Sequence, residues 1–230
     1  MPGVVGLAAP KPLGRLQSGS DVRAIKFPAG CAFRIGRCFG RWVAEQHPGE
    51  APPRVSVGQD PRTSGDVLCA ALCAGLREGG AEPVRLGLAT TPAVFGSTFL
   101  DDDAAYDGGI MVTASHLPHE WNGMKFFRPS GGLDKATLSG ILALDEELPA
   151  VDAEAAAAAA AAGGDGDATD TFMERYTADM VARMRSVAAE TPELDAETPL
   201  RGMKVAVNAG NGGGSVVVKV LDALGADTAG

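Results

Sequence analysis

The sequence is poor in aromatic residues and histidine. Aromatic residues make up 5% of its 230 residues, and there are three histidines. It also has no apolar run near the ~20 residues that a helix needs to cross a bilayer. Residues 1–15 lack the long apolar core of a secretory signal. These absences argue against a membrane-spanning or secreted protein.

Cysteine is scarce as well, at four residues: Cys31, Cys38, Cys69 and Cys73. Cys69 and Cys73 lie four positions apart within a helical apolar pattern, and no histidine stands near them to complete a zinc site. We therefore interpret all four cysteines as buried free thiols in a reducing compartment.

The net charge of −9 favours neither nucleic acid nor an anionic membrane as a partner. The charge is unevenly distributed, because the chain up to Trp42 carries seven basic residues and one acid, Asp21. Two explanations remain open for this basic excess: binding of an anionic small molecule, or a solvated basic face.

Short apolar strands alternate with helical patterns along the first two thirds of the chain. Strands are expected at 54–57, 84–88, 109–113 and 123–127, and helices at about 64–77, from 91, and at about 133–148. The strand at 109–113 does not alternate, which predicts burial on both faces. This order of elements favours an α/β sandwich.

The last third of the chain reads differently. The alanine run 155–162 and the glycines after it predict a linker over 151–168. A capping pattern at Thr171 and Glu174 then opens a packed helix within 169–192. A strand at 204–208, a glycine-rich turn at 210–214 and a helix from Ser215 form one βα unit. That unit cannot close a core by itself, so we expect 198–230 to be the start of an incomplete second domain.

The stretch from Met111 to Phe127 concentrates the reactive side chains, with Ser115 and His116 after a buried strand and Lys125 ten residues beyond the serine. Serine is a weak nucleophile and needs a base, a metal or a covalent charge to react. Ser115 does not lie in a Gly-x-Ser-x-Gly elbow, and His116 is its immediate neighbour, so a hydrolase triad is disfavoured but not excluded. A tight turn, a triad and a phosphoryl carrier therefore remain open.

Several segments, in order, resemble the α-D-phosphohexomutases, the phosphoglucomutases and phosphomannomutases. They are Ser18-Gly19-Ser20-Asp21-Val22-Arg23, Gly58-Gln59-Asp60-Pro61-Arg62-Thr63-Ser64-Gly65, Gly87-Leu88-Ala89-Thr90-Thr91-Pro92, Thr113-Ala114-Ser115-His116 with Asn122-Gly123-Met124-Lys125, and Asn208-Ala209-Gly210-Asn211-Gly212. The resemblance covers most of the chain from residue 16, which would follow a short extension at 1–15. It implies a three-layer α/β/α sandwich with a mainly parallel mixed sheet over 16–150, then a truncated second α/β domain of the same kind.

The resemblance also implies a role for each matched residue. Ser115 would carry the phosphoryl group, and its phosphate would supply one ligand to a single Mg²⁺ ion. Lys125 would act as general acid and base, and His116 and Arg23 would contact the phosphoryl group or substrate. Further roles in orienting the loop, pairing with Asp60 or shaping the loop would fall to the remaining matched residues: Arg62, Asn122 and Gly123. The partner would be a hexose phosphate, glucose or mannose phosphate, exchanged between its 1- and 6-phosphates through a bisphosphate.

Parts of the family pattern are missing from these residues. The family's Asp-x-Asp-x-Asp-Arg metal loop has no match, and Asp165, Asp167 and Asp170 have the wrong spacing and precede the second domain. We therefore expect an N-terminal fragment without mutase turnover of its own. The alternative is a non-catalytic remnant that serves as a binding or regulatory module. A cytosolic location is expected, with a plastid as the alternative.

Overall fold

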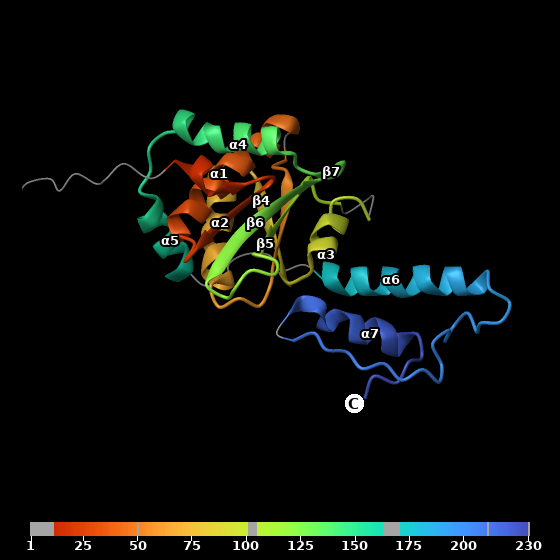
Figure 1. The fold of residues 1–230 in the computed structure, drawn as a ribbon. Coiled ribbons are helices and arrows are strands. Elements are labelled where there is room, and N and C mark those ends of the chain that lie inside the picture. The colour runs from red at the N-terminus through yellow and green to blue at the C-terminus, as the bar shows by residue number, and fades with distance from the viewer. Residues whose placement is uncertain (1–11, 50, 101–104, 163–170, 211, 230) are drawn as a thin grey trace, which may run out of the picture.

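A computed structural model describes residues 12–49, 51–100, 105–162, 171–210 and 212–229. Its first part is built on one sheet of seven strands (Figure 1). The strands are β1 (Gln17–Ser18), β2 (Asp21–Ile25), β3 (Arg54–Gln59), β4 (Glu82–Leu88), β5 (Gly108–Val112), β6 (Trp121–Arg128) and β7 (Gly131–Gly132). The helices are α1 (Ala29–Gln46), α2 (Gly65–Glu78), α3 (Thr91–Gly96), α4 (Lys135–Glu147), α5 (Ala153–Ala162), α6 (Phe172–Ala189) and α7 (Val216–Ala223).

The sheet is mixed, with the strand order β1-β2-β6-β5-β3-β4 and β7 paired to β6. Parallel pairing is confined to β3 with β4 and β3 with β5. β6 runs antiparallel to both β2 and β5, so the sheet is less parallel than the sequence suggested. The cause is the short connection from β5 to β6, because a loop of this length returns the chain antiparallel, whereas a parallel return needs a longer crossover.

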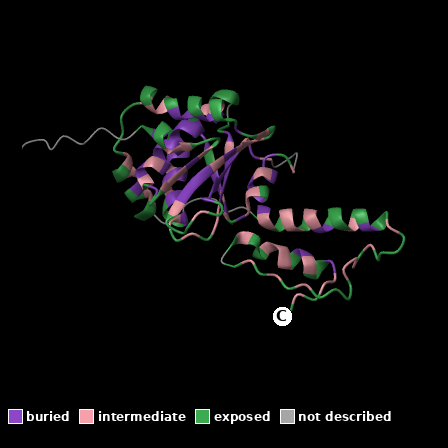
Figure 2. Cartoon of the chain, viewed as in Figure 1, coloured by how far each residue is buried: buried purple, intermediate pink, exposed green. Residues whose placement is uncertain are grey.

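Helices cover both faces of the sheet, as expected for three layers (Figure 1). One face packs Val57, Ile110 and Val112 against α1, α2 and α4 in the main apolar core. The opposite face packs Met111 with residues of α3 and with Phe172 of α6 in a smaller cluster. All five residues of β5 are buried, which confirms the prediction from its lack of alternation (Figure 2).

The 18-residue helix α1 lies in a stretch for which the sequence predicted no element. It packs against α2 with glycines at the contact. A β-carbon at Gly36 would overlap the carbonyl oxygen of Leu72, and one at Gly75 would overlap that of Phe33. Small residues allow the two backbones to approach closely, and they also weaken the apolar periodicity by which helices are found in a sequence.

Residues 153–162, placed by the sequence in a linker, form α5, which packs against α1 and α2. Ala157 is buried there, and the Glu154 side chain lies against Gly30 near the start of α1. Alanine favours helix, and its small side chain lets α5 lie close to its neighbours. The low-complexity run thus extends the helical layer of the first part.

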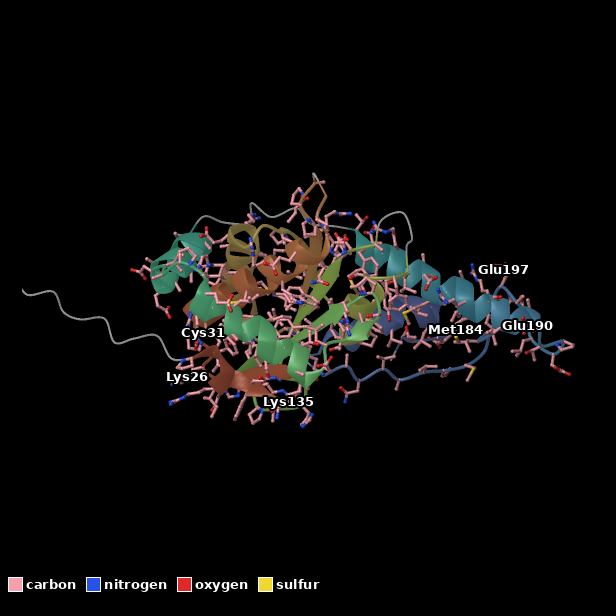
Figure 3. The ribbon with its side chains drawn as sticks, turned by 90° about the horizontal axis from the view of Figure 1, so that it is seen from above. Lys26, Cys31, Lys135, Met184, Glu190 and Glu197 are labelled. Atoms are coloured by element: carbon pink, nitrogen blue, oxygen red, sulfur yellow. The ribbon has the colours of Figure 1, made fainter. Side chains whose placement is uncertain are left out.

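The last part of the chain contains α6 and α7, which pack side by side through Val181, Val220 and Leu224. The strand predicted at 204–208 is not formed. A single parallel bridge joins Lys204 to Asp227. No strand among the described residues pairs with this segment, so the bridge does not extend into a strand. Met184 and Glu190 lie on the end of α6 that projects away from the sheet (Figure 3), and Met184 is 47% exposed. No helix in the described ranges is long and apolar enough to span a membrane.

Candidate active site at the serine loop

Polar residues that follow three parallel strands gather at one edge of the sheet. β3, β4 and β5 run parallel and therefore end at the same edge. Asp60 follows β3, Thr90 follows β4, and Thr113 and Ser115 follow β5. The carboxyl ends of parallel strands are where open α/β sheets bind their ligands.

Ser115 has a left-handed backbone conformation, with φ of 55°. A residue with a side chain is disfavoured there by on the order of 1 kcal/mol or more, so the surroundings must impose it. The Ser115 N–H donates a hydrogen bond to the hydroxyl oxygen of Thr113 at 2.9 Å, and that hydroxyl donates to Asp60 at 2.6 Å. The turn that exposes Ser115 is thus tied to the end of β3.

Arg62 binds the backbone of the rest of the serine loop. Its guanidinium group donates hydrogen bonds to four carbonyl oxygens: Ser115 at 3.0 Å, Leu117 at 2.9 Å, Pro118 at 2.7 Å and Trp121 at 2.9 Å. It also pairs with Asp60 at 3.0 Å. Arg62 therefore contacts the loop and Asp60 at the same time, because the planar guanidinium has enough donors for both.

A cleft of about 620 Å³ opens in front of the loop. Ser115, His119, Thr90 and Thr91 line it, and Gly212 and Gly213 form part of its wall. The Ser115 hydroxyl makes no hydrogen bond with any residue that the structure describes. It is therefore available to a molecule in the cleft.

His116 is exposed and is not among the residues that line this cleft, whereas His119 is. A turn in the serine loop brings His119 back to the cleft. No sequence signal singled out His119, because the local pattern does not indicate which histidine of the loop lines the cleft.

Arg23 and Lys125 reach the same sheet face through strand register. Arg23 lies opposite Gly123, whose carbonyl accepts a hydrogen bond from the Thr113 N–H at 2.9 Å. Lys125 lies opposite both Asp21 and Met111, and Met111 lines the cleft. Opposed residues share a face of the sheet, so Arg23 and Lys125 lie on the same sheet face as Met111, although neither of them lines the cleft. Arg23 is paired with Asp21 at 2.5 Å.

Asn122 and Gly123 shape the start of β6. The Asn122 side chain is buried, donates to the Ser64 hydroxyl at 2.9 Å and accepts from the Gly123 N–H at 2.8 Å. A β-carbon at Gly123 would overlap the carbonyl oxygen of Val22. Glycine is therefore required where β6 approaches β2 beside Arg23.

The residues that the structure describes do not form a magnesium site by themselves. Within the described ranges, no group of three histidine, cysteine or carboxylate side chains could hold a metal. Asp60 is already hydrogen-bonded to Arg62 and Thr113, which leaves Ser115 as the one oxygen of the predicted set. Asp165, Asp167 and Asp170 lie outside the described residues.

Residues 16–146, more than half of the chain, match the family model described as phosphoglucomutase/phosphomannomutase, alpha/beta/alpha domain I. The chain is 35% identical over 201 residues to phosphoglucosamine mutase of Corynebacterium glutamicum (strain R), covering 86% of this chain and 41% of that protein. It is 38% identical over 202 residues to phosphoglucosamine mutase of Ligilactobacillus salivarius (strain UCC118), covering 85% and 40%.

A crystal structure of a phosphoglucomutase/phosphomannomutase family protein from Burkholderia thailandensis superposes with a TM-score of 0.66 at 25% identity. It covers 91% of this chain and 42% of that one. The fold and the serine loop define an α/β/α sandwich domain of the phosphohexomutase class. The chain belongs to the phosphoglucomutase/phosphomannomutase family, and residues 16–146 are its domain I. It spans about two fifths of the length of the two curated relatives.

Proposed function

We propose that this chain carries the phosphoserine part of a phosphohexomutase active site. Ser115 would accept a phosphoryl group from a hexose bisphosphate and return it to a hexose phosphate, so that the 1- and 6-phosphates interconvert. The observation that carries the proposal is the Ser115 hydroxyl, presented to the cleft on a loop that Arg62 fixes at four carbonyls. Family membership and the names of the relatives support it.

Phosphoryl transfer depends on positioning and on charge stabilisation more than on covalent assistance. In the proposed step the bond between phosphorus and the Ser115 oxygen breaks, and a bond to the sugar hydroxyl oxygen forms. The proton of that hydroxyl passes to Lys125 in its amine form, the departing Ser115 oxygen takes up a proton from the solvent, and Arg23 balances charge on the phosphoryl oxygens. Arg23 and Lys125 lie on the same sheet face as Met111, which lines the cleft, and this supports these assignments.

The sugar is part of the proposal. The resemblance seen in the sequence favours glucose or mannose phosphate, whereas the two relatives are named phosphoglucosamine mutases. All three sugar phosphates therefore belong in an assay.

The test uses the protein in its full natural length, incubated with glucose 1,6-bisphosphate and analysed by peptide mass spectrometry. We expect one phosphate on Ser115, none in Ser115→Ala, and an unchanged result in Ser130→Ala, which removes an exposed serine from the turn after β6. A phosphate on another residue, or turnover that survives Ser115→Ala, would refute the proposal.

A parallel assay with glucose, mannose and glucosamine 1-phosphates, with and without Mg²⁺, identifies the substrate and the metal requirement. A protein that binds the phosphosugars but converts none of them would instead support the binding or regulatory module.

A further inference from the structure

Gly213, in the glycine-rich turn, approaches Ala89 of the first domain closely. An added β-carbon at Gly213 would stand 2.7 Å from the carbonyl oxygen of Ala89. Real β-carbons do not approach backbone atoms so closely, so a side chain here must displace one of the two segments. At the next residue, Gly214, the nearest atom to such a β-carbon is 3.9 Å away.

Neither side of this contact can easily yield. Ala89 is buried, and its N–H donates a hydrogen bond to the Gln59 carbonyl at 3.0 Å, which fixes it to the end of β3. On the other side, Gly213 begins a short 3-10 helix that leads into α7, and Val220 of α7 and the adjoining Leu224 pack against Val181 of α6. A methyl group at Gly213 would therefore clash with the Ala89 carbonyl, and neither Ala89 nor the segment that carries Gly213 is free to move away.

The contact also forms a wall of the serine cleft. Gly213 lines the cleft that contains Ser115, and it lines a second, mainly apolar cleft between α6 and α7 as well. The glycine-rich turn thus separates the two clefts. A shift of Gly213 away from Ala89 would therefore move part of the wall of the serine cleft.

We propose that Gly213 is a positioning residue for the reaction. Its missing side chain lets the glycine-rich turn close the serine cleft to the width that a phosphosugar needs. This inference rests on the proposed function, because it assigns the cleft to the phosphosugar. The turn acts on binding and not on the serine loop, since Arg62, Asp60 and Thr113 hold that loop independently of Gly213.

The experiment compares Gly213→Ala with Gly214→Ala in the protein of full natural length. The two variants add the same methyl group at adjacent positions, and only the first meets the Ala89 carbonyl. The rate of Ser115 phosphorylation is measured against the concentration of glucose 1,6-bisphosphate. For Gly213→Ala we expect the half-saturating concentration to rise on the order of tenfold, with the maximal rate changed about twofold or less. Gly214→Ala should match the unmodified protein.

Equal half-saturating concentrations for the two variants would overturn the inference, as would an equal loss in both. A fall confined to the maximal rate would also overturn it, because that would place the effect on the serine loop.

Amide hydrogen exchange provides a second readout that does not depend on activity. Its first measurement needs no variant. In the unmodified protein, glucose 1,6-bisphosphate should slow exchange at residues 212–216 as well as at 113–119. Slowing at 113–119 alone would overturn the role of Gly213 while leaving the proposed function intact. Without ligand, Gly213→Ala and not Gly214→Ala should speed exchange at 88–92, which tests the contact even if Ser115 is never phosphorylated.

Discussion

The guanidinium group of Arg62 donates a hydrogen bond to the carbonyl oxygen of Ser115 at 3.0 Å, and the same side chain binds three further carbonyls of the loop. An arginine that follows β3 thereby determines the shape of the loop that follows β5. The candidate phosphoryl carrier thus depends on a residue 53 positions away in the sequence.

Replacing Arg62 with alanine leaves four carbonyl oxygens and Asp60 without this partner. We expect the free energy of unfolding to fall by about 2–4 kcal/mol, since hydrogen bonds to charged groups contribute more than neutral ones. Phosphorylation of Ser115 should slow at least tenfold, because in-line transfer depends on position. Arg62→Lys should recover little, since one ammonium group cannot bind all these oxygens.

The matched control is Arg41→Ala on α1, which removes an exposed arginine paired with Glu45. It should change the stability by less than about 0.5 kcal/mol. Urea unfolding compares the variants, and equal losses in Arg62→Ala and Arg41→Ala would contradict the role of Arg62.

Thr113 is the link between Asp60 and the Ser115 backbone. Thr113→Val keeps the shape but removes the hydroxyl, so that the Ser115 N–H and Asp60 each lose a hydrogen bond. A cost of about 1–3 kcal/mol is expected for such unsatisfied groups, with slower phosphorylation of Ser115. Thr113→Ser should restore both properties, and a serine variant no better than valine would argue against this link.

Two substitutions at Ser115 test whether the loop imposes its positive φ. Ser115→Ala and Ser115→Gly both remove the hydroxyl and should both abolish phosphorylation. Glycine adopts positive φ without strain, so Ser115→Gly should be more stable than Ser115→Ala by about 1 kcal/mol. Urea denaturation measures the difference, and equal stabilities would mean that the loop does not hold residue 115 at φ of 55°.

Two glycine-to-alanine changes, one at the contact between α1 and α2 and one on the open surface of α4, should have opposite effects on stability. Gly75→Ala should destabilise by about 1–3 kcal/mol, because its methyl group would overlap the Phe33 carbonyl. Gly140→Ala on α4 meets no atom within 4 Å and should stabilise by about 0.5–1 kcal/mol through helix propensity. Thermal unfolding measures both signs. A stabilising Gly75→Ala would contradict the close packing.

Burial raises the pKa of the Cys38 thiol to about 12, with the negative charge of Asp145 adding to the effect. In the unfolded chain the thiol ionises near its ordinary pKa of 9.0, so the rising pH stabilises the unfolded state before the folded one. Stability that is present below pH 9.0 should therefore be lost as the pH rises toward 12. Urea midpoints above pH 9.0 should fall less steeply in Cys38→Ala than in the unmodified protein, and equal slopes would contradict the burial of this thiol.

Much of the first part could be predicted from local pattern. The helix α2, the strand β5 and the turn before α3 follow from apolar spacing, from a run without alternation and from a proline in the first helical turn. The helix α1 could not be predicted in this way, because glycines occupy part of its buried face and its partner residues lie in α2. The strand at 204–208 was predicted from composition and did not form, since a strand needs a neighbour as well as β-branched residues.

The sequence by itself determined the family, the mixed α/β class and the loop that holds Ser115, because ordered local motifs and short periodicities carry that information. The tertiary structure alone decided that Arg62 binds four loop carbonyls, that His119 and not His116 lines the cleft, and that Gly213 meets Ala89. These contacts join residues on different strands and helices. Their geometry depends on sheet register and on the packing of whole elements, which no local pattern encodes.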